Sequence, residues 1–209
     1  LYLSGGPGYA TGLDKEGMKL WWDWLKTQKW SHDLVLFDQR GTGLSTPSLT
    51  CPELRTLIRD TLAKPLTQEE SFALTKPVIQ QCYARLRQAG IDLSSYTTTR
   101  NSHDAGDLME LLGGSKQKWN LYGISYGTRL ALAILRDYPH RIRSVILDSV
   151  YPPEIQELLE TPFLYDNAFT TLVKGCQADT SCQTAFPKLE DSLFSLFQQL
   201  RKQPLLLTI

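Results

Sequence analysis

The sequence has no excess of charge of either sign and no long apolar run. Lysine plus arginine and aspartate plus glutamate both number 22, so the formal net charge is zero. Electrostatic attraction therefore favours neither nucleic acid nor an anionic membrane as a partner. The strongly apolar stretches, 33–37 and 144–147, have the length of strands and fall far short of the ~20 residues that a membrane-spanning helix needs. We expect an ordinary globular protein without a membrane span.

An initiating methionine and a secretory signal pattern are both missing from the start, which reads Leu1-Tyr2-Leu3-Ser4. The chain stops in an apolar run over 205–209 with no polar tail after it. We interpret the first residues as the end of a strand. We expect this chain to be a fragment that lacks the first strands and the C-terminal part of its fold. A signal peptide would then lie outside these residues.

Metal-binding and redox spacings are missing too, because the four cysteines form no CxxC and the three histidines lie far from them. We expect neither a metal nor a cofactor. Disulfides are the better interpretation of Cys51, Cys82, Cys176 and Cys182. Of the three possible connectivities, the sequential one, Cys51 to Cys82 and Cys176 to Cys182, keeps each bridge inside one helical segment. These bridges would stabilise the fold by about 3 to 4 and about 2 kcal/mol respectively. Bridges indicate a periplasmic or extracellular compartment, and four buried thiols in a cytosolic protein are the alternative.

Strand-sized apolar segments alternate with amphipathic helices over the first 150 residues, which predicts a mainly parallel sheet with helices on both faces. A polar helical insertion over about 52–90, with a capping-box start at Thr67-Gln68-Glu69-Glu70, interrupts the alternation, and after residue 153 the pattern is helical only. We therefore predict an α/β core over 1–150 and the start of an inserted helical cap over 151–209. The expected strands are 1–3, 34–37, 119–122 and 143–147, and the expected core helices are 15–29, 101–112 (N-cap Asn101 or Ser102) and 125–138.

One motif predicts nucleophilic chemistry. Gly123-Ile124-Ser125-Tyr126-Gly127 has the form G-x-S-x-G and stands between an expected strand and an expected helix. At such a position the serine occupies a strained turn that projects its hydroxyl from the sheet edge, and flanking glycines avoid clashes in the bend. This context makes Ser125 the predicted nucleophile and indicates the α/β-hydrolase fold.

A second motif, Gly5-Gly6-Pro7-Gly8, follows the first expected strand. A tetrahedral intermediate needs two fixed N–H donors, one from the residue after the nucleophile and one from the loop after an earlier strand. Tyr126 would supply the first. Gly6 is the predicted second donor, because Pro7 has no N–H and glycine allows close approach of backbone to substrate.

The histidine base and the acid that orients it are not identified. In this fold they follow the serine in the order serine, acid, histidine. His32 and His103 precede Ser125, and His140 lies at the far end of the helix that begins with the serine, roughly 20 Å away. Asp148 is a candidate acid, although a capping role at a strand end is favoured. We expect the base, and with it the acid, beyond residue 209.

The segment 38–45, Asp38-Gln39-Arg40-Gly41-Thr42-Gly43-Leu44-Ser45, lacks the G-K-[ST] ending of a phosphate loop. We expect a structural role, in which Asp38 and Arg40 brace the loops around the site.

These three motifs in this order resemble the proline iminopeptidase and tripeptidyl aminopeptidase group of α/β-hydrolases, and the cysteine pattern is similar to its secreted branch. The likeness covers nearly the whole chain. It implies release of residues or short peptides from free N-termini through an acyl-enzyme on Ser125, with cap carboxylates binding the substrate's ammonium group. Glu154, Glu157 and Glu160 lie near the start of the cap but match none of the family's amine-binding residues. Ser4 stands where many iminopeptidases have histidine, a departure that fits the secreted branch and concerns the rim of the oxyanion pocket.

Two alternatives stay open. The same machinery cleaves esters, so a carboxylesterase or lipase-like hydrolase is the rival enzyme. A non-catalytic relative or an inactive fragment is the second alternative. The predicted partner is a peptide with a free N-terminus, and the sequence indicates no oligomeric state.

Overall fold

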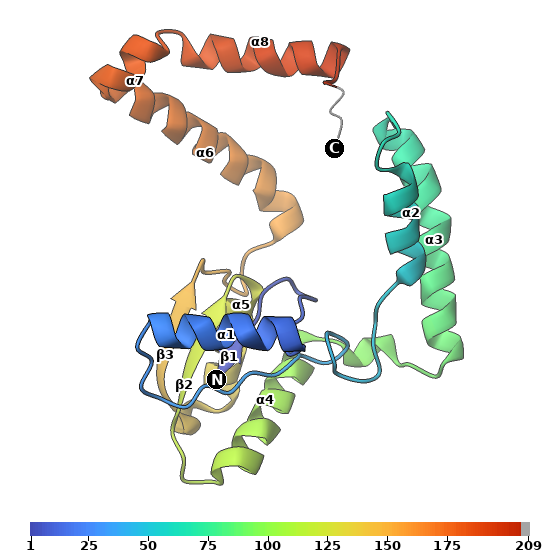
Figure 1. Ribbon diagram of the computed structural model, residues 1–209, viewed down its shortest axis with the longest axis vertical. Coiled ribbons are helices and arrows are strands. Elements are labelled where there is room, and N and C mark those ends of the chain that lie inside the picture. Colours follow the sequence, from blue (N-terminus) through green and yellow to red (C-terminus); the bar gives the residue numbers. More distant parts are fainter. Residues whose placement is uncertain (206–209) are drawn as a thin grey trace. The chain divides into compact units, whose positions relative to one another are not determined.

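The computed structural model describes residues 1–205, without the side chains of residues 157 and 158 (Figure 1). Backbone contacts divide the chain into two compact units, one over Leu1–Pro153 and one from Glu154 onward. The prediction that these are a hydrolase core and the start of its cap stays a prediction. Among the described residues, every helix is too short or too polar to cross a membrane.

A parallel sheet forms the centre of the first unit. Its strands are β1 (Tyr2–Leu3), β2 (Trp119–Ile124) and β3 (Ile142–Asp148), in the order β1-β2-β3. Tyr2 is opposite Tyr122 in the register of β1 and β2, and Ile124 is opposite Asp148 in that of β2 and β3. Parallel neighbours need long crossovers, which the helices between these strands supply.

Helices cover both faces of this sheet (Figure 1), so the predicted fold class is confirmed. Because side chains alternate along a strand, Leu3 and Leu121 turn to one face and Tyr2 and Tyr122 to the other. On the first face, α4 (Thr98–Gly113) and α5 (Tyr126–Asp137) close an apolar core, which contains Leu3, Met109, Leu121, Leu130 and Ile134. On the other face, α1 (Lys15–Thr27) places Trp21 edge-on against Tyr2, with ring centroids 4.7 Å apart.

The helical insertion consists of α2 (Pro52–Thr61) and α3 (Gln68–Gln88), which pack against each other. The predicted capping box is present: Thr67 accepts from the Glu70 N–H, and the Glu70 carboxylate accepts from the Thr67 N–H. A short 3₁₀ turn, η1 (Leu93–Ser95), leads to α4, and a second one, η2 (Pro139–Arg141), connects α5 to β3.

The second unit is helical, as the sequence predicts for this part of the chain. It consists of α6 (Glu157–Ala178), α7 (Thr180–Ala185) and α8 (Leu189–Lys202). The apolar run at 205–209 lies outside the described residues from position 206 onward.

Two predictions about elements are wrong. Residues 34–37 are not a strand: the segment accepts one bond from β1, Tyr2 N–H to Val35 O at 3.0 Å, and β1 is too short to offer a longer ladder. The helix expected over 101–112 begins earlier, with Thr97 as N-cap, whose hydroxyl accepts from the Arg100 N–H. Asn101 and Ser102 do not cap it because their buried side chains bond to other elements.

Candidate active site

Ser125 occupies a sharp turn between β2 and α5. Its backbone has φ 54° and ψ −121°, a left-handed φ that residues with a Cβ rarely adopt. The turn is held from two sides, because the Ser125 N–H donates to the Asp148 carbonyl at 2.9 Å and the Ser125 carbonyl accepts from the Thr128 N–H and hydroxyl. The residue is exposed in this unit, while Tyr126, directly after it, is buried. The geometry is that of a side chain presented from a strained strand-to-helix turn.

The glycines on either side of Ser125 are required by close packing of backbone. A Cβ on Gly123 would lie 2.4 Å from the Gly127 carbonyl oxygen. A Cβ on Gly127 would lie 1.9 Å from the Leu3 carbonyl oxygen, on the neighbouring strand. Any side chain at either position would force α5 away from the sheet and displace the turn that carries Ser125.

The glycine-proline loop lies beside Ser125. A Cβ on Gly5 would be 3.2 Å from the Ser125 Cβ and 3.8 Å from its Oγ, so the loop backbone reaches the serine hydroxyl. Gly6 has φ +112°, and a Cβ there would lie 2.6 Å from the Gly8 nitrogen. Glycine is therefore needed at position 6 both for its conformation and for space.

Tyr126 begins α5, and the first N–H groups of a helix have no partner within it. The Tyr126 N–H and the loop containing Gly6 therefore border the serine from the helix side and from the loop side. Whether these two N–H groups receive an oxyanion stays a prediction.

A buried hydrogen-bond network connects the loop to Tyr126. The Gln39 Nε2 donates to the Ser4 carbonyl at 2.9 Å and approaches the Ser4 hydroxyl at 3.3 Å. The Asn101 Nδ2 donates to the Gln39 Oε1 at 3.3 Å and to the Tyr126 hydroxyl at 3.4 Å. The Tyr126 hydroxyl also bonds to the Thr98 hydroxyl at 2.9 Å. Sequence reasoning missed Gln39 and Asn101, and their only signal was that Gln39 stands inside the 38–45 motif.

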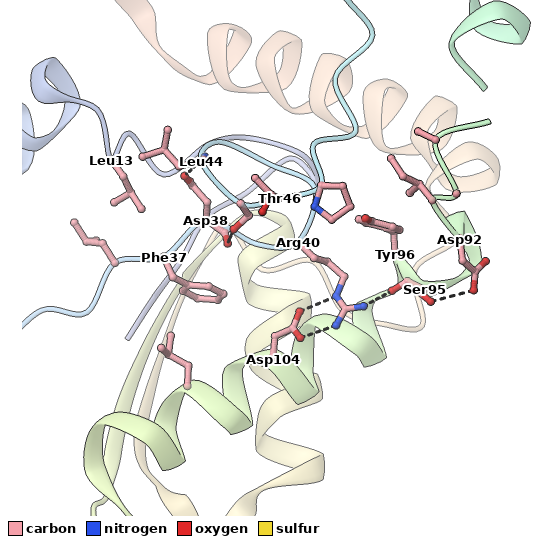
Figure 2. A pocket seen from close by; sticks show the side chains of 17 residues that line it. Leu13, Phe37, Asp38, Arg40, Leu44, Thr46, Asp92, Ser95, Tyr96 and Asp104 are labelled. Atoms are coloured by element: carbon pink, nitrogen blue, oxygen red, sulfur yellow. Dashed lines mark hydrogen bonds and ion pairs between the residues drawn. The ribbon is translucent and has the colours of Figure 1, made fainter. Parts of the chain in front are cut away.

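Asp38 and Arg40 brace neighbouring loops, as expected from the sequence. Asp38 accepts from the Thr11 N–H at 2.6 Å and from the Leu44 N–H at 2.8 Å. Figure 2 shows the Arg40 guanidinium forked onto Asp104 of α4, at 2.7 and 2.5 Å, while a third N–H reaches the Ser95 carbonyl. Asp38, Arg40 and Asp104 are among the residues that line a cavity of about 850 Å³. The Asp104 partner raises the pKa of Arg40 above its ordinary value.

Asp148 ends β3 next to Ser125 in the register, and its side chain is exposed. One carboxylate oxygen accepts from the Tyr122 hydroxyl at 3.4 Å and the other from the Ser149 hydroxyl at 3.2 Å. Burial, and then the negative charge of Asp148, raises the pKa of Tyr122. Burial likewise raises the pKa of Tyr2, with smaller contributions from Tyr122 and Asp148. Asp148 therefore takes its hydrogen bonds from hydroxyl groups and contacts no histidine within the described residues.

The three histidines lie away from Ser125. His103 is on α4 near Asp137, the last residue of α5. The pKa of the Asp137 carboxyl is lowered by its hydrogen bonds with Arg136 and then Ser102, with a smaller contribution from His103. His140 lies in η2, beyond the same end of α5. Twelve helical residues separate this end from Ser125, about 18 Å at 1.5 Å per residue. His32 is in the exposed loop after α1.

Both sequence-predicted cysteine pairs are bonded in the structure, Cys51 to Cys82 and Cys176 to Cys182. Cys51 and Cys82 come near Glu53 in a grouping that resembles a metal site, but the disulfide leaves no thiolate there to bind an ion.

Of the three glutamates near the start of the second unit, Glu160 caps its own helix, with its carboxylate accepting from the Gln156 N–H at 3.1 Å. The Glu157 side chain lies outside the described residues, and Glu154 is exposed.

The strand-to-helix turn at Ser125, the flanking glycines without room for a Cβ and the adjoining glycine loop are features of the α/β-hydrolase fold. The chain belongs to the alpha/beta hydrolase fold family, whose model matches residues 1–201.

Among individual proteins, the chain is similar to tripeptidyl aminopeptidase of Streptomyces lividans, at 29% identity over 162 residues, 73% of this chain and 28% of the relative. It is 27% identical to serine protease Hip1 of Mycobacterium tuberculosis (strain H37Rv) over 161 residues, 72% of this chain and 30% of the relative. It is 24% identical to putative hydrolase YuaR of Escherichia coli K12 over 193 residues, 87% of this chain and 35% of the relative. These relatives confirm the resemblance to the aminopeptidase group. The chain spans about a third of their length.

Proposed function

We propose that this chain is the nucleophile-bearing part of an extracytoplasmic serine hydrolase that releases residues or short peptides from the free N-termini of peptides. The observation that carries the proposal is that Ser125 is exposed, has φ 54° and lies beside the backbone of the glycine loop. The two disulfides support the compartment, because such bridges persist in oxidising surroundings. The names of the relatives, tripeptidyl aminopeptidase and serine protease, support the substrate class.

In the proposed reaction, the Ser125 Oγ attacks the carbonyl carbon of the scissile amide and loses its proton to a histidine base. The N–H groups of Tyr126 and Gly6 receive the oxygen that becomes negative, which lowers the barrier because these donors are already oriented. The base then protonates the leaving nitrogen and the C–N bond breaks. Water hydrolyses the resulting serine ester and releases the N-terminal product.

The histidine base and its acid are proposed to come from outside residues 1–209. His103 and His140 lie near the opposite end of α5, so neither can reach the Ser125 hydroxyl in this fold. The experiments below therefore use the full-length protein.

The test compares tripeptidyl and aminoacyl anilides, the same peptides with an acetylated N-terminus, and short acyl esters. We expect turnover of the free peptides, with kcat/KM at least about 10²-fold lower after acetylation because the ammonium group is lost as an anchor. Ser125→Ala should lower kcat by more than about 10³-fold. Ser71→Ala, on the exposed face of α3, is the matched control and should be unchanged.

Two outcomes would contradict this proposal in different ways. Unchanged turnover by Ser125→Ala would remove Ser125 from the mechanism. Turnover of acyl esters far above that of every peptide, abolished by the same substitution, would keep the nucleophile and replace the exopeptidase with an esterase.

A further inference from the structure

The side chain of Gln39 is almost completely buried, at 3% exposure, although nothing in the proposed reaction uses it. A buried amide destabilises a fold unless both of its ends are hydrogen-bonded. Its Nε2 is directed to the carbonyl of Ser4, which can only accept, so the orientation of the amide is determined and Oε1 must face the other way. Oε1 meets the Nδ2 of Asn101.

The orientation of Gln39 in turn sets that of Asn101. Because Asn101 must present its NH₂ group to the Gln39 Oε1, the same NH₂ also reaches the Tyr126 hydroxyl, and its own Oδ1 is left over. That oxygen is buried and has no hydrogen-bond partner among the described residues. A network built for stability alone would gain from an apolar substitute with no orphaned acceptor, so the arrangement is better explained by what it positions.

The two ends of the network are the two sides of the proposed oxyanion site. At one end the Ser4 carbonyl belongs to the planar peptide unit that contains the Gly5 N–H, and Gly6 follows directly. At the other end the phenol of Tyr126 is held by Asn101 and Thr98, while its N–H stands at the start of α5. Side-chain hydrogen bonds thus join Ser4 to Gln39 across 35 residues and Gln39 to Asn101 across 62 residues.

We propose that Gln39 is a positioning residue of the oxyanion site, which acts by setting the separation of the glycine loop from Tyr126. The proposal rests on the proposed function, because it concerns the same site. An oxyanion donor displaced by a fraction of an ångström stabilises the transition state less while leaving substrate binding intact, so the loss falls on kcat rather than on KM.

The test uses Gln39→Met in the full-length protein, because methionine matches the length of glutamine without its polar atoms. We expect kcat for a tripeptidyl anilide to fall about 10- to 100-fold, less than the 10²- to 10³-fold effect of removing a donor, with KM within about twofold. The Ki of a tripeptide boronic acid, whose tetrahedral serine adduct occupies the oxyanion site, should rise by the same factor as kcat/KM falls. The Ki of the tripeptide product should not change. Gln81→Met, on the exposed face of α3, is the matched control.

Tyr126→Phe approaches the network from its other end, since it removes the hydroxyl and keeps the proposed N–H donor. Tyr126→Phe should lower kcat and leave KM unchanged, as Gln39→Met does. The fold decrease in kcat of the double variant should be smaller than the product of the fold decreases of the two single variants. If Gln39→Met fails to fold, the kcat and KM of Tyr126→Phe test the proposal instead.

A purely structural role would lower the melting temperature and leave kcat and the boronate Ki within about twofold, and that result in the folded variant would overturn the proposal. Failure of the proposed function is distinguishable, because it would appear in Ser125→Ala as retained turnover, whatever Gln39 does.

Discussion

The conformation of Ser125 depends on residues that have no part in bond making. Gly123 and Gly127 remove the Cβ atoms that would separate α5 from the sheet. The Thr128 hydroxyl is fully buried, donates to the Ser125 carbonyl at 2.6 Å and accepts from the Tyr151 N–H at 2.7 Å. The turn is thereby over-determined by its surroundings, which is the condition for a strained backbone to persist.

Gly127→Ala tests this packing. The new Cβ would lie 1.9 Å from the Leu3 carbonyl oxygen, which belongs to a sheet strand and cannot swing aside. We expect unit Leu1–Pro153 to be destabilised by at least about 1–3 kcal/mol and activity to fall, measured by urea unfolding and anilide turnover.

The matched control is Gly175→Ala in the last turn of α6, where a Cβ would meet no atom within 4 Å. Because alanine favours a helix over glycine by about 1 kcal/mol, this variant should be unchanged or slightly more stable. Equal effects of the two substitutions would show that the close approach at Gly127 does not constrain the turn.

At the scale of elements, α2 and α3 depend on cross-links rather than on a core of their own. Cys82 and Leu86 are the buried residues of α3, and α2 has none. The Cys51–Cys82 bridge closes a loop of 31 residues at the base of the pair. Arg85 adds an ion pair with Glu53 at 2.5 Å and a bond to the Thr50 carbonyl at 2.9 Å.

Replacing Cys51 and Cys82 together by serine should therefore loosen this hairpin. The chain-entropy relation gives a loss of about 3–4 kcal/mol, and hydrogen exchange should accelerate in both helices before it does in α4 or α5.

The Cys176–Cys182 bridge closes a loop of 6 residues, so replacing both of these cysteines by serine should cost about 2 kcal/mol, confined to the second unit. If hydrogen exchange in α2 and α3 stays unchanged after Cys51 and Cys82 are replaced, helix packing alone holds the hairpin.

For the molecule as a whole, the segment that follows β3 is held by residues of the first unit up to Pro153. Tyr151 is bonded to Thr128, and the Arg129 guanidinium lies 4.5 Å from the Tyr151 ring centroid and donates to the Pro153 carbonyl. From Glu154 to Gln156 the backbone has no helix or strand in the structure.

Limited proteolysis should therefore begin after Pro153. With a glutamate-specific endopeptidase, the first cut is expected at Glu154, and the fragment that ends there should persist while the second unit is digested further. Mass spectrometry of the early fragments measures this. A first cut within 98–148 would contradict the division into two units.

Local patterns in the sequence predicted much of this structure. The strand-to-helix context of Gly123–Gly127 identified the turn at Ser125, the period of apolar residues identified α1, α5, β2 and β3, and Thr67 with Glu70 marked the start of α3. These features depend on neighbours within a few residues, so the chain itself carries the signal.

Tertiary contacts decided the rest. Asn101 is a good N-cap by type, but its side chain bonds across 62 residues to Gln39, so the helix begins at Thr98 instead. Residues 34–37 have strand composition, yet a ladder requires a partner of sufficient length, and β1 supplies two residues. The sequence by itself thus determined which residue stands on the strained turn. Only the folded backbone, in which hydrogen bonds join segments far apart in sequence, decided which buried amides connect that turn to the glycine loop.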